Sequence, residues 1–419
     1  MLQLPEIQSL YSLTPDGRQL FATRMVRMFA YGLIAIVLGL YLSAVGFADT
    51  QIGLILSLTL LGDAAVSLPI TIIADRLGRR RMLILGSALM IFAGIVFALT
   101  SNLVFLIAAA IIGTISPSGN EVGPFLAVEQ AALPHTTTPQ QRTQVFAWYS
   151  LGGSILTGLG SLAGGLLSQY LVNAGQTPLN SYRAVILVYA ALGAVLAVMF
   201  TRLSPAIEVE TAPGPVTLQG LFGLKRSRGV VTRLSLLFMI DAFAGGLVVQ
   251  SLVALWFHRR FGIDPAVIGA IYLGANFFAG LSALAAARVA ARYGLVNTMV
   301  FTHVPSNILL ILVPLMPNLP LAIAMLLARF SISQMDVPTR QSYTVAVVDP
   351  EERSAANGLT NIARTTASAL SPGVTGAMFS AGGIWLSAPF LVAGGLKLIY
   401  DALLYRMFQS VKPPEEQKP

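Results

Sequence analysis

The chain contains no cysteine and little charge. The lack of cysteine excludes disulfide bonds and thiolate metal sites. Charged residues make up 11% of the 419 residues, against about 25% in soluble domains. Hydrophobic residues make up 55% of the chain, and the mean hydropathy is +0.74. Several windows exceed the ~18 apolar residues that a bilayer-spanning helix needs, so the composition predicts a multi-pass integral membrane protein.

Hydropathy predicts an all-α membrane protein with twelve transmembrane helices. The predicted helices are 20–44, 51–74, 82–100, 103–132, 142–171, 183–202, 231–256, 266–290, 296–316, 319–347, 354–381 and 384–407. The first residues, MLQLPEIQSLYSLTPDG, have no basic start and no continuous apolar core. We therefore expect no cleavable signal peptide.

The net charge of +8 indicates topology rather than nucleic-acid binding, because the basic residues gather in alternate loops. These residues are Arg76, Arg79, Arg80, Arg81, Lys225, Arg226, Arg228, Arg233, Arg288 and Arg292. The positive-inside rule then predicts that both termini and the 203–230 loop are cytoplasmic. We expect the membrane to be a bacterial inner (plasma) membrane.

One polar, Pro- and Gly-bearing stretch divides the chain into related halves. It predicts a six-helix half at 1–202, a cytoplasmic linker at 203–230, a second six-helix half at 231–407 and a tail at 408–419. VGFADTQIG, from position 45, resembles FGIDPAVIG, from position 261. Glu129-Gln130 and Arg340-Gln341 occupy equivalent places, 211 residues apart (340 − 129). Two pseudo-symmetric halves are expected of transporters built from parallel repeats.

The segment ADRLGRRR, from position 74, resembles the loop motif G-x-x-x-D-R-x-G-R-R of the major facilitator superfamily. The matching residues are Asp75, Arg76, Gly78, Arg79 and Arg80. Thr71 stands where the leading glycine would be, and the second copy, ARYG from position 291, keeps Arg292 and Gly294. The resemblance implies secondary active transport by two rocking halves, with Asp75 as a latch on the cytoplasmic side. The alternative is that the arginines anchor the loop at anionic headgroups.

A second motif resembles the drug/proton antiporter-like branch of the same superfamily. Its pattern in helix 5 is G-x-x-x-G-P-x-x-G-G, and this chain has LTGLGSLAGG from position 156. Gly160, Gly164 and Gly165 match it, while Pro372 stands in the corresponding part of helix 11. Glycines at this density allow close helix packing.

Ten charged residues fall inside the predicted spans, where a charge is costly unless it is paired or reaches water. They are Arg24, Arg27, Asp63, Glu121, Glu129, Asp241, Arg329, Asp336, Arg340 and Arg364. Five are basic and five acidic, which favours internal pairs. Eight of the ten lie on helices 1, 4, 7 and 10, which line the central cavity in the superfamily that the chain resembles.

We predict that Glu129 and Arg340 form a salt bridge between the halves, as a cytoplasmic gate. The alternative is a pair within one half, such as Asp336 with Arg340 at i,i+4. The repeat also suggests that Asp241 pairs with Arg24 or Arg27.

Glu121 and Asp336 are the predicted proton carriers, because a carboxyl group desolvated at mid-membrane can bind and release protons near neutral pH. The alternative is that they are permanently ionised partners of Arg364 and Arg27. Asp63 is interpreted either as a coupling site or as a structural hydrogen-bond acceptor.

Several further polar residues are predicted to be structural. Lys397 and Asp401, at i,i+4, are expected to neutralise each other, and His303 and His258 are expected to have no functional role. Pro124 and Pro338 are predicted to kink helices 4 and 10 near their charges.

The sequence predicts a transporter and not an enzyme, because it has no phosphate-binding loop, no metal-ligand spacing and no nucleophile with a base. We expect a monomer that moves a small molecule among membrane lipids, with the proton as coupling ion, no cofactor and no nucleic-acid partner. Proton-coupled export by alternating access is the first hypothesis. The alternatives are a proton-coupled uptake symporter for a small organic anion, a lipid or lysolipid transporter, and a membrane assembly factor or receptor that kept the fold.

Overall fold

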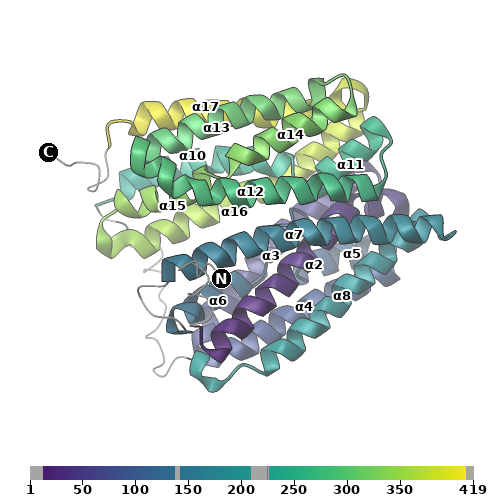
Figure 1. Ribbon diagram of the computed structural model, residues 1–419, viewed down its shortest axis with the longest axis horizontal. Coiled ribbons are helices and arrows are strands. Elements are labelled where there is room, and N and C mark those ends of the chain that lie inside the picture. Colours follow the sequence, from purple (N-terminus) through teal and green to yellow (C-terminus); the bar gives the residue numbers. More distant parts are fainter. Residues whose placement is uncertain (1–12, 137–141, 209–223, 225, 412–419) are drawn as a thin grey trace, which may run out of the picture. The chain divides into compact units, whose positions relative to one another are not determined.

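The computed structural model describes residues 13–136, 142–208, 224 and 226–411 (Figure 1). Every regular element in these ranges is a helix. The chain divides into two compact units, each described here by itself. The N-terminal unit is drawn from Met1–Phe47, Leu58–Pro215 and Ile263–Leu273, and the C-terminal unit from Ala48–Ser57, Val216–Gly262 and Gly274–Pro419. Each unit thus includes the first residues of a helix that continues in the other.

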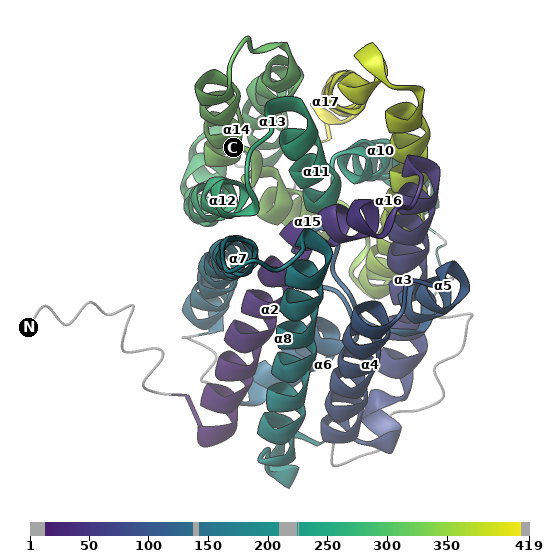
Figure 2. The ribbon, with the colours of Figure 1, turned by 90° about the vertical axis from the view of Figure 1, so that its right-hand side faces the viewer.

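The helices that begin in the N-terminal half follow the hydropathy pattern with one interruption. They are α2 (Pro15–Val45), α3 (Asp49–Leu77), α4 (Arg79–Leu99), α5 (Leu103–Ile112), α6 (Phe125–Ala132), α7 (Arg142–Asn173) and α8 (Pro178–Thr201). Figure 2 shows α8 running between α2 and α4, and α8 packs against both of them. Gly78, at φ 103°, makes the turn between α3 and α4, a conformation that favours glycine.

The C-terminal half has a similar order of helices. They are α10 (Arg228–Leu247), α11 (Gln250–Phe261), α12 (Pro265–Tyr293), α13 (Leu295–Leu312), α14 (Leu319–Ser333), α15 (Asp336–Ala346), α16 (Arg353–Ala381) and α17 (Ala388–Phe408). Ten helical segments of the described chain are long and apolar enough to cross a membrane, with α10 and α11 counted as one and α14 and α15 as one. The other two predicted spans correspond to α5 with α6 and to α16.

Close packing of α2 on α7 depends on glycine. A Cβ atom added to Gly160 would lie 1.9 Å from the carbonyl oxygen of Phe29, and one added to Gly164 would lie 2.6 Å from that of Leu33. At Gly165 the added atom would lie 2.3 Å from the carbonyl oxygen of Pro265. In the C-terminal unit, a Cβ atom added to Gly53 would lie 2.4 Å from the carbonyl oxygen of Pro372. Backbones approach at these points as small residues permit.

Three predicted helices are broken, so the prediction of continuous helices there was wrong. Helix 103–132 is interrupted by a coil at 113–124, helix 231–256 breaks at Val248–Val249, and helix 319–347 breaks at Gln334–Met335. In the coil, Gly119 and Gly123 take positive φ. Pro124 caps the start of α6 instead of kinking a continuous helix, because proline lacks an N–H and is tolerated at a helix start. Pro338 likewise lies in the first turn of α15.

The breaks in helices 4 and 10 occupy equivalent places in the repeat. α6 begins at Phe125 and α15 begins at Asp336, which are 211 residues apart (336 − 125), the same shift that relates Glu129 to Arg340. Irregular backbone at membrane depth is tolerated where protein buries it or where it lines a water-filled cavity. The breaks in helices 4 and 10 therefore mark equivalent positions in the two halves, where the backbone is buried by protein or lines a cavity.

Candidate functional site: two buried charge clusters

The N-terminal charge cluster centres on Arg27 of α2, whose side chain is 0% exposed. Its Nε lies 2.8 Å from Oε1 of Glu121, and its Nη2 lies 2.7 Å from Oε2 of Glu129. Tyr149 of α7 donates its hydroxyl to Glu129, and the guanidinium of Arg27 lies 4.7 Å from the ring centroid of Phe125. A buried carboxylate requires this kind of compensation.

Arg27 connects the coil that interrupts helix 4 to α6. Glu121 lies in the coil and Glu129 lies in α6, and the guanidinium binds both. Since an arginine presents its donors in a rigid plane, it fixes the position of the coil relative to α6.

Arg24 extends this cluster with incomplete hydrogen bonding. Its Nη2 lies 3.3 Å from Oε2 of Glu121, and its guanidinium stacks 4.0 Å from the ring centroid of Tyr149. Nε of Arg24 and Oε2 of Glu121 are buried without a hydrogen-bond partner among the described residues. Arg24 lies close against Gly153, because a Cβ atom added to this glycine would lie 3.0 Å from Nε of Arg24. A buried donor and acceptor left unmatched are costly, and they suit a polar ligand or water.

Asp63 of α3 holds the same coil from another side. Its Oδ1 accepts hydrogen bonds from the backbone N–H of Gly123 at 2.5 Å and from Oγ of Ser67 at 3.2 Å. No lysine or arginine of the described chain forms an ion pair with it. Both interpretations of Asp63, a coupling site and a structural acceptor, fit these contacts.

The C-terminal charge cluster centres on Asp241 of α10. Its Oδ1 lies 2.5 Å from Nζ of Lys397, and its Oδ2 lies 3.2 Å from Arg340 and 3.4 Å from Arg364. Arg340 also binds Asp336, one turn earlier in α15, at 2.8 Å. Four helices, α10, α15, α16 and α17, thus contribute to one buried network.

His303 of α13 joins this network to a further carboxylate. Its Nδ1 lies 2.7 Å from Oδ1 of Asp401, and its Nε2 lies 3.8 Å from Oδ1 of Asp241. Asn307 donates to Oδ2 of Asp401 at 2.8 Å. Sequence reasoning missed His303 and Asp401 as members of the cluster. The available signal was the pair of polar residues His303 and Asn307, at i,i+4 within an apolar helix.

The expected pair of Lys397 with Asp401 was wrong. Lys397 forms its ion pair with Asp241 instead, while Asp401 is hydrogen-bonded to His303 and Asn307. The i,i+4 spacing brings two side chains to one helix face, but α17 packs against α10 and α13, and polar groups of those helices bind the two side chains instead.

The predicted pair of Asp241 with Arg24 or Arg27 would join the two units, and it stays a prediction. Every ion-pair partner of Asp241 in the described chain comes from the C-terminal unit, and those of Arg24 and Arg27 are Glu121 and Glu129.

Glu129 and Arg340 have partners inside their own units, and the bridge between the halves stays a prediction. The alternative, Asp336 with Arg340, is present. Of the alternative partners expected for the two predicted proton carriers, Glu121 binds Arg27, whereas Asp336 binds Arg340 and not Arg364. Both clusters therefore satisfy their charges locally.

The loop motif after α3 is tied to the first residues after α8. Asp75 binds Arg79 at 2.8 Å, and Arg79 donates to the carbonyl of Ile207 at 3.2 Å. Glu208 accepts from the backbone N–H groups of Arg79, at 2.6 Å, and of Arg80, at 3.2 Å. A carboxylate at the start of α4 satisfies donors that a helix leaves unpaired. The predicted latch function of Asp75 stays a prediction, and Arg76 is exposed.

Replacing Glu208 with alanine should therefore destabilise the N-terminal unit by about 1 kcal/mol, because two helix-terminal N–H groups lose their acceptor. Thermal unfolding of the detergent-purified protein measures this effect. Glu351→Ala is a control with the same change of charge at an exposed site. Equal melting temperatures for the two variants would contradict the capping role.

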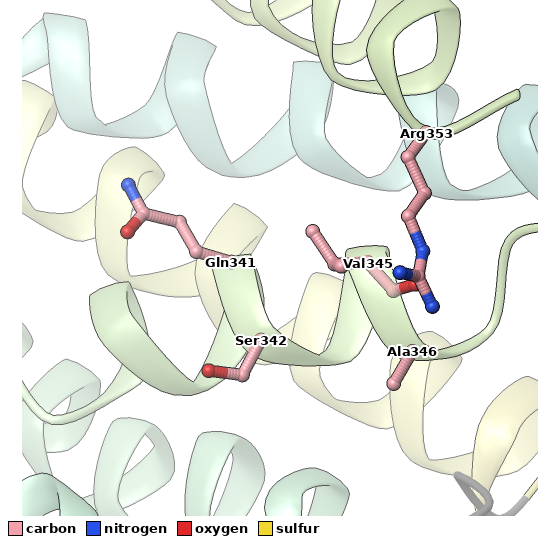
Figure 3. A pocket seen from close by; sticks show the side chains of 5 residues that line it. All are labelled: Gln341, Ser342, Val345, Ala346 and Arg353. Atoms are coloured by element: carbon pink, nitrogen blue, oxygen red, sulfur yellow. The ribbon is translucent and has the colours of Figure 1, made fainter. Parts of the chain in front are cut away.

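A separate surface hollow of about 480 Å³ lies between α15 and the start of α16 (Figure 3). It is lined by Gln341, Ser342, Val345, Ala346 and Arg353. The hollow includes no member of either charge cluster, and the guanidinium of Arg353 is held by the carbonyl of Val345 at 3.0 Å. It is not the site that the buried charges define.

The family model of the major facilitator superfamily matches residues 20–257 and 234–419. The chain therefore belongs to this superfamily of membrane transporters. A Saccharomyces cerevisiae relative, "Uncharacterized membrane protein YJR124C", is 31% identical over 425 residues, which cover 94% of each chain.

Solved structures show the same fold at low identity. The nucleoside transporter NupG matches with a TM-score of 0.73 and 16% identity, over 94% of this chain and all of that one (100%). A bacterial homologue of the human lysosomal transporter Spinster, inward-facing and occupied, matches with a TM-score of 0.68 and 18% identity, over 94% and 96%. The human organic anion transporter MFSD10 matches with a TM-score of 0.63 and 18% identity, over 93% and 100%. The resemblance to the family and the all-helical membrane fold are thereby confirmed.

Proposed function

We propose that this transporter moves a small organic anion by alternating access and couples that movement to protons. The observation that carries the proposal is the C-terminal charge cluster. Three cations surround Asp241, and one of them, Arg364, has a side chain that is 29% exposed, against 9% for Arg340 and 8% for Lys397. A partly exposed guanidinium beside an otherwise buried network is suited to bind a carboxylate or phosphate group.

The interrupted helices support the same proposal. Hydrophobic segments broken at corresponding positions of two repeats point to the binding site in many secondary transporters. Here the two breaks are related by the repeat, and each is bordered by a charge cluster. A membrane scaffold that did not transport would retain these costly charges without use.

Export of a cationic or zwitterionic compound is the second candidate. The observation that favours it is Oε2 of Glu121, a buried acceptor that has no hydrogen-bond partner among the described residues and lies 3.3 Å from Nη2 of Arg24. In that case the compound would bind in the N-terminal cluster, and protons would move in the opposite direction. Lipid or lysolipid transport, and a non-transporting role as assembly factor or receptor, are the outcomes if neither kind of compound binds.

The structural neighbours support transport of small molecules as a class. Their names refer to nucleosides for one and to organic anions for another. We propose that the chain works as a monomer among membrane lipids, with the proton as its coupling ion and without another cofactor. We also propose that both termini are cytoplasmic, because the basic residues gather in alternate loops of the sequence.

A thermal-unfolding screen tests the proposal. The detergent-purified protein is unfolded at about pH 6 and about pH 8 with organic anions, cations, zwitterions and lysolipids, since a ligand of the native state raises the melting temperature by mass action. We expect anions to stabilise the protein more at the lower pH, and Arg364→Gln to remove that stabilisation. Stabilisation by cations alone would favour the second candidate. No stabilisation by any soluble compound would contradict both.

A further inference from the structure

His303 lies between two buried carboxylates that come from different helices. Its Nδ1 is 2.7 Å from Asp401 on α17, and its Nε2 is 3.8 Å from Asp241 on α10. The side chain is 5% exposed and meets the ring of Tyr400 edge-on, with the centroids 5.8 Å apart. Histidine changes its charge near neutral pH, and the two ring nitrogens of His303 face two different carboxylates.

The two carboxylates have unequal compensation. Asp241 has Lys397, Arg340 and Arg364 around it. Asp401 is held by His303 and Asn307, and no lysine or arginine of the described chain forms an ion pair with it. His303 therefore lies between one acid that several cations surround and one that it shares with Asn307.

The charged and titratable groups around His303 come from every helix that contributes to the cluster or packs against α13. They are Lys397, Tyr400, Asp401 and Tyr405 from α17, Asp336, Arg340 and Tyr343 from α15, Asp241 from α10, Arg364 from α16 and Arg329 from α14. The guanidinium of Arg329 lies 5.1 Å from the ring centroid of Phe330, on its own helix. Within the network of ion pairs, three cations and three aspartates cancel when His303 is neutral.

Arg364 is the cation of this network that an outside ligand can engage most readily. It is the most exposed, and its contact with Asp241, at 3.4 Å, is the longest of the three. An anion that binds Arg364 competes with Asp241 for the guanidinium, so that Asp241 loses part of its compensation. The less compensated charge then attracts a proton to the nearby imidazole.

We infer that His303 takes up a proton when a small organic anion binds Arg364. The link runs through Asp241, which contacts both groups, and Asp401 holds the resulting imidazolium. By linkage, a lower pH must tighten anion binding by the same factor. The inference rests on the proposed function, because joint binding of an anion and a proton is what a proton-coupled anion symporter requires.

Nuclear magnetic resonance of the imidazole nitrogens tests this inference without any transport assay. The chain has three histidines, and the signals of His303 are those absent from His303→Gln. In ¹⁵N-histidine-labelled protein in nanodiscs, we expect Arg364→Gln to raise the titration midpoint of His303 by about one pH unit. Arg353→Gln, the same change at an exposed position of the same helix, should leave the midpoint in place.

Benzoate serves as the anion probe. It should raise the midpoint of His303 in the unmodified protein and have no effect in Arg364→Gln. Lys397→Gln removes another cation from Asp241 and should also raise the midpoint. The test therefore does not depend on the correct folding of a single variant. A midpoint of His303 that is the same in Arg364→Gln and Lys397→Gln as in the unmodified protein would overturn the inference. A shift in these variants without any response to benzoate or to other organic anions would overturn the anion assignment and leave the charge link standing.

Discussion

Replacing Arg27 with methionine is expected to destabilise the protein by about 3–5 kcal/mol, the range for removal of one member of a buried ion network. Arg27 is wholly buried and compensates Glu121 and Glu129 together. Its loss leaves two carboxylates in a region with little water, and it also releases the coil between α5 and α6. Thermal or denaturant unfolding in detergent measures the effect.

Arg24→Met is the matched control for this prediction. Glu121 keeps Arg27 when Arg24 is removed, so we expect a clearly smaller loss of stability than for Arg27→Met. Adding Glu129→Gln to Arg27→Met should recover part of the lost stability, because one unpaired charge disappears. If Arg27→Met proved no more harmful than Arg24→Met, the role of Arg27 in holding the helix break would be wrong.

Replacing Asp241 with asparagine is expected to have the largest effect in the C-terminal unit. The substitution leaves Lys397, Arg340 and Arg364 around a neutral amide, and of these three cations only Arg340 keeps an ion pair in the described chain, with Asp336. We expect a loss of stability of about 3–5 kcal/mol and the loss of proton-coupled transport. Unfolding in detergent and transport in liposomes check the two parts separately.

Charge balance gives the control for this second prediction. Lys397→Met in the Asp241→Asn background removes one uncompensated cation and should restore part of the stability, though not the coupling. Asp336→Asn should reduce the stability less than Asp241→Asn, because Arg340 retains its ion pair with Asp241. An Asp241→Asn protein that is as stable as Asp336→Asn would show that Asp241 is not the centre of the network.

Hydropathy and the repeat predict most of the fold. A membrane-spanning chain needs long apolar helices, and such helices are recognisable in the sequence as long apolar segments. The break in helix 4 could not be located from hydropathy, which averages over a window. The residues TISPSGNEVGP do contain two prolines and two glycines, and Gly119 and Gly123 are the positions that take positive φ. Such a combination indicates interruption more strongly than a uniform window suggests.

The buried charges were predicted as a set, but of their pairs only Asp336 with Arg340 and Glu121 with Arg27 were among the alternatives. Local spacing favoured Lys397 with Asp401, whereas packing of α17 against α10 and α13 decides both contacts. His303 was expected to be structural, and its place in the cluster depends on the meeting of α10, α13 and α17. Pairing inside a membrane bundle depends on tertiary contacts, which residue spacing does not encode.

Proton movement linked to a transported anion is the central claim, and internal pH is its most direct measurement. Liposomes containing the purified protein and the pH dye pyranine would receive membrane-impermeant organic anions outside, at equal pH on both sides, with protein-free liposomes as the background. The proposal predicts that at least one anion acidifies the interior with the unmodified protein and does not with His303→Gln or Arg364→Gln. An anion that enters while the internal pH stays constant, or one that acidifies the interior equally in His303→Gln, would contradict it.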